Sequence, residues 1–396
     1  MSSTKRCTYC SRPLTSDTSS PEHIILHALG GKRSSVDIVC RDCNNRLGSQ
    51  VDKSLPESLE LIRCMLDIPG HGGPTARARG VSTGREYRVH PGGEKELLDV
   101  EAPKDVPASR APSEPVRISG ARDKVESVLD GLSRKHGPVR IESAESVIYR
   151  EPLTPIRKTQ LGGPEQERSI MKMALNLVAE AAEQFGLSVF DEAFRPARRF
   201  VSEGHPFVPR ACQIDSRPLF ALPPVSGAAF YNRVSVFCDP KAGNVIAAVE
   251  VLSELRFSVL LARQYDGEPM AFSITNLPLE RGADEIRNIG SVVSIDTNAL
   301  LDRGSDQEWL ETCQCSFERL LERVMTYDQN RFISEAICSA ARAAGGDAST
   351  TENMDRFCTE LAERLVEGLL PPGRVIRQRY RDPDHPDDAK SEDATP

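Results

Sequence analysis

The chain has 396 residues, of which 39% are apolar, so it is long enough to form two or three domains with buried cores. Its formal net charge of −8 excludes a surface that is basic throughout, so binding to a nucleic-acid backbone would need a local basic surface, a partner or an oligomer. The sequence has no run of about 18 apolar residues and no basic-then-apolar leader, which predicts a cytoplasmic protein without a membrane-spanning segment.

The first element is a bracket of four cysteines. Cys7 and Cys10 form one Cys-x2-Cys pair, and Cys40 and Cys43 form a second pair. Two such pairs, separated by enough chain to fold back, present four thiolates to one tetrahedral ion and predict a structural zinc (Zn2+) site. A tetrathiolate site is closed, so this zinc has no open position for a substrate. The odd total of 11 cysteines fits a reducing compartment, where thiols stay unpaired.

A smaller group of reactive residues lies inside this bracket. Glu22 and His23 are adjacent between the two pairs, and Asn44 follows the last cysteine directly. A carboxylate is a ligand for a hard divalent cation, and an imidazole accepts a proton from water near neutral pH. The carbonyl oxygen of Asn44 is suited to complete the coordination of the same cation. His27 is either a second ligand or phosphate contact, or an ordinary exposed histidine, which is the simpler reading.

The combined pattern resembles a known family. Cys-x2-Cys is followed by Glu-His-Ile-Ile, then Ala-Leu-Gly-Gly at 28–31, then Cys-x2-Cys-Asn-Asn-x2-Gly at 40–48. This order resembles the HNH endonucleases, which are ββα-metal nucleases, of the type with a four-cysteine zinc. The resemblance implies that His23 is the general base, that Glu22 and Asn44 bind a catalytic Mg2+ or Mn2+ ion, and that the substrate is a nucleic acid, with DNA as the first expectation.

Two positions depart from the family pattern. Leu26 stands where the family usually has proline, which loosens a turn but removes no ligand. The family's middle asparagine, which supports the active-site loop and the orientation of the histidine, falls near Ser35, with Asp37 as the nearest polar alternative. These departures bear on efficiency more than on the type of reaction.

Periodicity and turn residues predict further elements along the chain. Gly48 is expected to end a short helix, and Gly186 to cap a helix over 165–186. The remaining expectations are a helix over 55–66, short strands over 75–100, a helix over 122–135, a strand over 139–143, antiparallel strands over 228–276, helices from 305, over 331–343 and over 353–369, and a disordered acidic tail over 382–396.

Polar residues on the predicted helix over 165–186 admit two readings. Lys172 and Asn176 lie four residues apart on what we interpret as a polar stripe, which either contacts a nucleic-acid backbone or is simply solvated. Arg195, Arg198 and Arg199 form a local basic cluster beyond this helix.

The predicted fold class is α+β. A small zinc-stapled ββα-metal module over 1–68 precedes a β-rich segment over 75–160, which contains a Pro-rich linker over 101–122. A larger α+β region over 161–375 contributes an antiparallel sheet and C-terminal helices, and a tail follows over 376–396.

Three functions compete at this point. The first is a metal-dependent HNH-type endonuclease, for which a role in bacterial defence is a family-level expectation and a homodimer is compatible, because a double-strand cut requires two active sites. The second is a non-catalytic zinc module that docks a nucleic acid or a protein, while the C-terminal region carries the main function. The third is a thiol redox switch, which metal analysis would separate from the first two because it would contain a reducible disulfide and no zinc.

Overall fold

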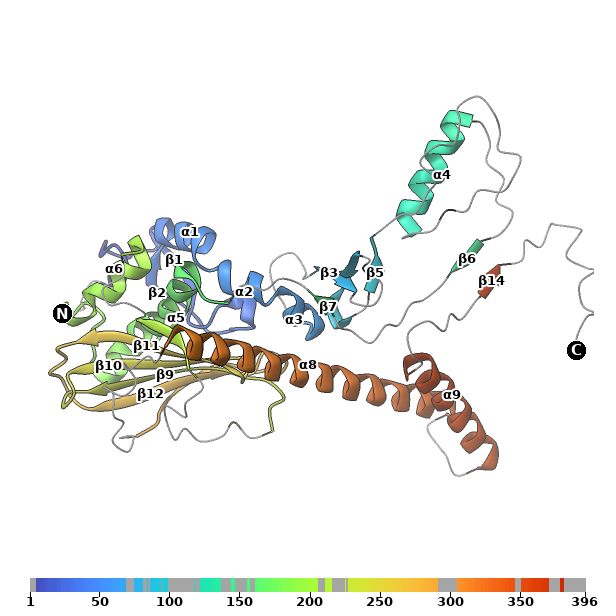
Figure 1. The fold of residues 1–396 in the computed structure, drawn as a ribbon. Coiled ribbons are helices and arrows are strands. Elements are labelled where there is room, and N and C mark those ends of the chain that lie inside the picture. Colours follow the sequence, from blue (N-terminus) through green and yellow to red (C-terminus); the bar gives the residue numbers. More distant parts are fainter. Residues whose placement is uncertain are drawn as a thin grey trace, which may run out of the picture. The chain divides into compact units, whose positions relative to one another are not determined.

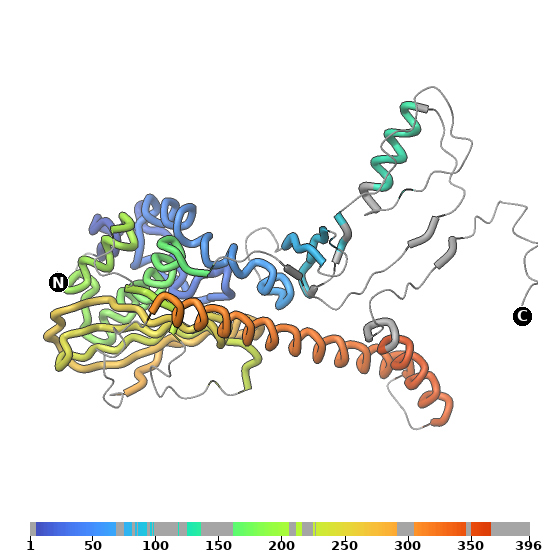
Figure 2. Tube along the Cα trace, viewed as in Figure 1, coloured from blue at the N-terminus to red at the C-terminus, as the bar shows by residue number. Residues whose placement is uncertain are grey.

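The computed structural model has mixed α+β architecture with antiparallel sheets and C-terminal helices, which confirms the predicted fold class (Figure 1). Figure 2 shows the described part of the chain in colour. The structure describes residues 5–68, 75–80, 84, 86–93, 95–98, 118, 122–136, 144–146, 155–156, 161–205, 211–215, 225, 227–290, 305–345, 350–369 and 378–380. No helix in these ranges is both long enough and apolar enough to cross a membrane.

The chain divides into two compact units. Unit 1 comprises Met1–Ala76, His90–Gly93 and Lys158–Asp328. Unit 2 comprises Arg77–Val89, Glu94–Arg157 and Gln329–Pro396. The cysteine bracket and the helix predicted over 165–186 therefore belong to the same unit, although the intervening sequence contributes to the other one.

Unit 1 begins with a ββα element. Strands β1 (Ser19–His23) and β2 (Ser34–Cys40) pair in antiparallel fashion, and a short 3-10 helix, η1 (His27–Leu29), lies in the loop between them. Helix α1 (Arg41–Gln50) follows directly and packs on both strands. The expectation that Gly48 ends this helix is wrong, because Gly48 does not adopt the positive φ that a capping glycine needs.

Two short helices follow α1. Helix α2 (Ser54–Ser58) and helix α3 (Glu60–Met65) replace the single helix expected over 55–66. The break falls at Leu59, whose φ of −103° and ψ of 10° depart from helical values. Leu59 is fully buried at this break.

Helix α5 (Pro164–Phe185) lies between the ββα element and the main sheet (Figure 1). Gly186 caps it with a φ of 66°, as predicted. It contacts β2 and α2 on one side, and α6 (Arg195–Glu203) and the sheet on the other. All residues from 169 to 178 are buried, so the middle of this helix has no solvated stripe.

The main sheet has six strands in the order β13-β12-β9-β10-β11-β8, and neighbouring strands pair in antiparallel fashion. Its four long strands confirm the antiparallel region expected over 228–276. The strands are β8 (Cys212–Ile214), β9 (Asn232–Asp239), β10 (Asn244–Val251), β11 (Leu255–Arg263), β12 (Met270–Asn276) and β13 (Glu285–Asn288).

The C-terminal helices are α8 (Asp306–Ala343) and α9 (Thr351–Leu369). The two helices expected before residue 343 are one continuous helix, because the sequence between its ends contains neither glycine nor proline. The other elements in the described part of the chain are β3 (Ala76–Gly80), β4 (Glu86–Val89), η2 (Pro91–Gly93), β5 (Lys95–Leu97), α4 (Arg122–His136), β6 (Ala144–Ser146), β7 (Pro155–Ile156), η3 (Glu192–Phe194) and β14 (Gln378–Tyr380).

Most of the linker expected over 101–122, the strand expected over 139–143 and the tail expected over 382–396 lie outside the described residues. Within the described part, the strands expected over 75–100 and the helices expected over 122–135 and 353–369 are present.

Candidate active site

The four cysteines of the bracket converge. The sulfur atoms of Cys7, Cys10, Cys40 and Cys43 all lie within 4.8 Å of one another, and Cys10 Sγ is 3.6 Å from Cys40 Sγ. Zinc–thiolate bonds of about 2.3 Å in a tetrahedron place sulfur atoms roughly 3.8 Å apart. The donor set and its spacing therefore fit a tetrahedral zinc ion. We call these side chains the thiol cluster.

Hydrogen bonding inside the thiol cluster favours a thiolate. The Cys43 thiol donates to Cys7, and this hydrogen bond lowers the pKa of Cys7 to about 4. The same contact raises the pKa of Cys43, because the pair holds one proton between two sulfur atoms. A thiolate is the form that binds metal, so the cluster already stabilises the reactive form of one ligand.

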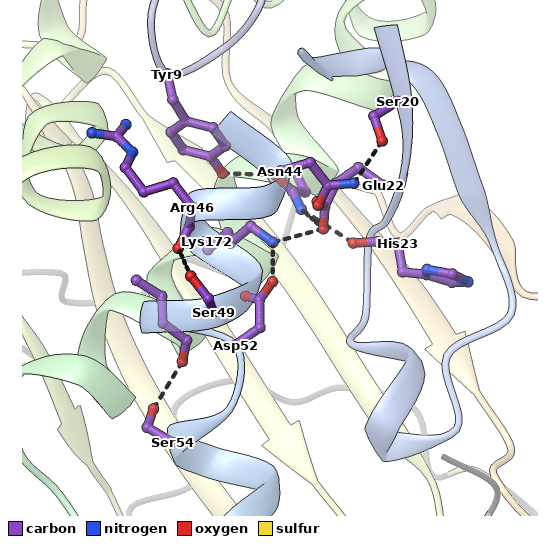
Figure 3. Close-up of polar contacts among 12 residues, drawn as sticks. Tyr9, Ser20, Glu22, His23, Asn44, Arg46, Ser49, Asp52, Ser54 and Lys172 are labelled. Atoms are coloured by element: carbon purple, nitrogen blue, oxygen red, sulfur yellow. Dashed lines mark hydrogen bonds and ion pairs between the residues drawn. The ribbon is translucent and has the colours of Figure 1, made fainter. Parts of the chain in front are cut away.

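The Glu22-His23 pair ends strand β1, and its two side chains point in different directions. Glu22 is buried, with 4% of its surface exposed, and its carboxylate faces helix α5 (Figure 3). The His23 imidazole points away from this carboxylate and is half-buried. Successive residues of a strand project to opposite faces, which explains the separation. The His23 ring lies 5.0 Å from that of His27, centroid to centroid.

Asn44 is held against the start of the same strand. Its amide nitrogen donates to Ser20 Oγ at 2.8 Å and to the carbonyl oxygen of Pro21 at 3.0 Å. These are the two residues directly before Glu22. Asn44 lies in the first turn of α1, immediately after Cys43, so the thiol cluster fixes the backbone that carries it.

Helix α5 contributes two buried polar side chains to this group, and the expectation of a polar stripe is wrong. Lys172 and Asn176 are both fully buried. Lys172 Nζ donates to Glu22 Oε1 and to Asp52 Oδ2, each at 2.7 Å. Asn176 Nδ2 donates to Glu22 Oε1 at 3.2 Å and to the carbonyl oxygen of His23 at 3.1 Å. Neither solvent nor a nucleic-acid backbone meets these groups, because α5 is buried on this side.

The charges around Glu22 do not cancel. One ammonium group, that of Lys172, is shared by the carboxylates of Glu22 and Asp52. Burial raises the pKa of Glu22 and the nearby charge of Asp52 adds to this, although Lys172 opposes both effects. Burial would lower the pKa of Lys172, but the two carboxylates outweigh it and the pKa is raised. The group thus has two carboxyl groups for one ammonium group in a largely buried place.

The oxygen atoms of Glu22 and Asn44 are compatible with a hard divalent cation. Both hydrogen bonds to Glu22 among the described residues meet Oε1, so Oε2 keeps its lone pairs. Asn44 uses its amide nitrogen for strand β1, which leaves its carbonyl oxygen as a ligand. Carboxylate and amide oxygens are the ligands that Mg2+ and Mn2+ take in proteins.

The loop between β1 and β2 is anchored to the main sheet. Asp284 Oδ2 accepts hydrogen bonds from the backbone nitrogens of Lys32 and Arg33, at 2.8 and 3.1 Å. Asn276 donates to the carbonyl oxygen of Gly30 at 2.8 Å, and Asn232 donates to that of Leu29 at the same distance. Residues far along the chain therefore set the conformation of the loop that follows His23.

Ser35 and Asp37, the alternatives for the missing middle asparagine, make other contacts. The Ser35 hydroxyl accepts a hydrogen bond from the backbone nitrogen of Asp37 at 3.2 Å. The Asp37 carboxylate is exposed and forms an ion pair with Lys5 at 3.1 Å.

A ββα element stapled by a thiol cluster, with an acidic residue and a histidine at the end of its first strand, is a zinc-type ββα module. Residues 7–60 match the family described as HNH endonuclease, which confirms the resemblance found in the sequence. The matched segment contains the thiol cluster, Glu22, His23 and Asn44. No curated protein and no solved structure gives a significant match to the chain.

The sequence did contain a signal for the residues that we misassigned. Lys172 lies between Met171 and Met173, and Asn176 lies between Leu175 and Leu177, in a stretch that is apolar on every face of the helix. A helix that is apolar all round is buried, so polar residues within it need buried partners. Tyr9 and Asp52 carried no comparable signal, because tyrosine and aspartate are common in exposed turns.

Proposed function

We propose that the protein is a metal-dependent endonuclease of the HNH type, which hydrolyses phosphodiester bonds of DNA. The observation that carries this proposal is that the segment matching the HNH endonucleases places Asn44 against the strand that ends with Glu22 and His23. Zn2+ in that cluster would be structural, because four thiolates leave no open position on the ion. The chemistry would then belong to the oxygen and imidazole groups.

Each of these groups has a defined task in the proposal. His23 accepts a proton from the attacking water at an imidazole nitrogen, on the side facing away from Glu22. Glu22 and Asn44 hold Mg2+ or Mn2+, which supplies positive charge to the phosphate and the leaving oxygen when it is bound. The thiol cluster keeps Asn44 in place relative to strand β1, so the ligand and the base stay at a fixed separation.

One observation favours the rival reading, a non-catalytic docking module. The ammonium group of Lys172 already lies 2.7 Å from Glu22 Oε1, where it partly satisfies the carboxylate that would hold a cation. In this reading the polar group at Glu22 only secures α5 against the ββα element. Direct activity measurements separate the two functions.

The test is cleavage of supercoiled plasmid with added Mg2+ or Mn2+, comparing the wild type with His23→Ala. We expect metal-dependent nicking or cutting by the wild type, lost in a His23→Ala variant that keeps its zinc and its fold. The matched control is His205→Ala, which removes an exposed histidine and should leave cleavage unchanged. No cleavage by the wild type, or equal cleavage by the wild type and His23→Ala, would favour the docking module.

The finer parts of the proposal have separate tests. Parallel assays with single-stranded DNA and with RNA test the preference for duplex DNA. Light scattering during cleavage tests the homodimer, which we propose because two active sites are needed for a double-strand cut. A role in bacterial defence predicts that expression of the wild type, and not of His23→Ala, reduces phage infection.

A further inference from the structure

Asn176 is a buried amide whose polar atoms all serve the candidate active site. Its nitrogen donates to Glu22 Oε1 and to the His23 carbonyl oxygen, and its own carbonyl oxygen accepts the Tyr9 hydroxyl at 2.7 Å. Tyr9 lies in the turn between Cys7 and Cys10, so the amide connects the turn of the thiol cluster to the end of strand β1. Asn176 comes from α5, outside the segment that matches the HNH endonucleases.

These contacts constrain two consecutive residues from one rigid group. A carboxamide is planar, so the directions of its two N–H bonds are fixed relative to each other. When both bonds are made, the Glu22 carboxylate and the His23 peptide carbonyl hold a set separation. That carbonyl belongs to the same residue as the imidazole, so the hydrogen bond restrains the backbone from which the His23 side chain leaves.

The ladder of the hairpin is interrupted directly before these two residues. The pairing of β1 with β2 shifts register between Ser20 and Glu22. Pro21, which lies at the shift, has no backbone N–H with which to continue the ladder. The ladder resumes at Glu22 and His23, which pair with Ser35 and Ser34, and the contacts from Asn176 add to this pairing from outside the hairpin.

The Tyr9 hydroxyl selects one orientation of the amide. A hydroxyl that donates to Asn176 requires the amide oxygen on its side, which directs both N–H bonds to Glu22 and His23. Tyr9 is itself buried, with 7% of its surface exposed, so this preference is not weakened by water.

We propose that Asn176 is a positioning residue of the endonuclease site, which sets the orientation of the Glu22 carboxylate and of the His23 side chain. This inference rests on the proposed function and deepens it, because it makes helix α5 of the C-terminal region a necessary part of the active site. Asn176 touches neither the substrate nor the cation in this role, and it acts through the two residues that do.

The experiment compares Asn176→Ser and Tyr9→Phe with the wild type, using the full chain. Asn176→Ser removes the two donors, and Tyr9→Phe keeps the aromatic ring but releases the amide to rotate. Gln184→Ser is the matched control, because it removes an exposed amide from the same helix. Zinc content and thermal unfolding define the folded fraction. Mn2+ affinity is measured by electron paramagnetic resonance of the free ion, and kcat at saturating Mn2+.

We expect folded, zinc-loaded Asn176→Ser to bind Mn2+ about 10- to 100-fold more weakly and to lose kcat by a similar factor, as is usual when a residue supporting a metal ligand is removed. Tyr9→Phe should show a smaller loss of both quantities, and Gln184→Ser should show none. Because Tyr9→Phe is the milder change, it decides the question if Asn176→Ser does not fold.

Unchanged Mn2+ affinity and kcat in the folded variants would overturn the inference. A loss of activity that only follows the loss of zinc or of folded protein would also overturn it, because it would show a purely structural role. A wild type that binds Mn2+ without cutting DNA would refute the proposed function, while the Mn2+ affinities would still decide the role of Asn176. A wild type that does not bind Mn2+ would refute both.

Discussion

At the scale of single residues, Lys172 has the most unusual environment. Its ammonium group is fully buried and lies 2.7 Å from each of two carboxylates, those of Glu22 and Asp52. Removing a charge from water is costly, so a buried lysine is stable only where opposite charges replace its hydration. The two carboxylates share one ammonium group, so the negative charge of each is balanced mainly by Lys172.

Replacement of Lys172 by methionine should therefore destabilise the protein strongly. The methionine side chain has similar length but no charge, so the buried Glu22 and the half-buried Asp52 would both lose their partner. We expect Lys172→Met to lower the free energy of unfolding by about 3 to 5 kcal/mol, measured by urea denaturation. Asp52→Asn in the same chain should restore part of the loss. Lys241→Met, at an exposed site, should change stability by less than about 0.5 kcal/mol. Equal effects of the two lysine variants would contradict this account.

Stability should also fall at alkaline pH, because of Tyr9 and Lys172. Burial raises the pKa of Tyr9 well above its ordinary value of 10.0, and the two carboxylates raise that of Lys172 above 10.5. Both groups keep their protons longer in the folded state than in the unfolded state. Their contribution to the free energy of unfolding is complete below about pH 10. It is lost as the pH rises through their pKa values in the folded state.

The measurement that isolates Tyr9 is the slope of the unfolding free energy against pH. Each proton bound only by the folded state contributes about 1.4 kcal/mol per pH unit. Tyr9→Phe removes one such proton, so we expect its curve above about pH 10 to be shallower than that of the wild type. Tyr327→Phe is a control, because it removes the hydroxyl of a tyrosine that is only half-buried. Parallel curves for the wild type and Tyr9→Phe would exclude the proposed contribution.

At the scale of elements, the loop between β1 and β2 depends on two glycines for different reasons. Gly30 adopts a φ of 90°, and a Cβ atom there would come within 2.7 Å of Pro278 Cβ in the main sheet region. Gly31 has no room for a Cβ atom, since it would lie 2.0 Å from the carbonyl oxygen of Ile25. The Ala-Leu-Gly-Gly motif is therefore a packing requirement of this loop as well as a family signature.

Two glycine substitutions should consequently act in opposite directions. Gly31→Ala forces the backbone at Ile25 to move, and we expect a loss of about 1 to 3 kcal/mol in the free energy of unfolding. Gly48→Ala places a methyl group in open space within helix α1, and we expect a gain of up to about 1 kcal/mol. Urea denaturation of both variants is the measurement. Destabilisation by Gly48→Ala would show that our description of α1 is wrong.

Local signals explain which elements the sequence could predict. The ends of α5 and the strands β9 to β12 follow from apolar periodicity and turn residues, which depend only on neighbours along the chain. The thiol cluster follows from cysteine spacing. The break at Leu59 interrupts a helical apolar pattern, and α1 continues past Gly48 although glycine often ends a helix, so local signals did not reveal either feature.

At the scale of unit 1, the candidate site is assembled from residues that lie far apart in the sequence. Glu22 and Lys172 are 150 residues apart, and Asp284 holds the backbone of Lys32 across 252 residues. The identity of Glu22, His23 and Asn44 as candidates was available from a local motif. The residues that hold them were not, because no local pattern states which distant side chain faces a given strand.

Removal of the thiol cluster should accordingly affect α5 as well as the ββα element. The turn between Cys7 and Cys10 carries Tyr9, which donates to Asn176 on α5, and Thr8, whose carbonyl oxygen accepts a hydrogen bond from Arg198 on α6 at 3.3 Å. We expect Cys43→Ser to lose bound zinc and to release this turn, because three thiolates hold the ion far less tightly than four.

Hydrogen exchange measures how far this effect extends. In Cys43→Ser, the backbone amides of α5 should exchange faster than in the wild type, since a helix that loses buried partners opens more often. Cys315→Ser is the matched control, because Cys315 is exposed and lies outside the thiol cluster. Faster exchange confined to the ββα element would mean that α5 is stable without it. Faster exchange in α5 as well would mean that metal binding at the thiol cluster stabilises the helix that carries Lys172 and Asn176.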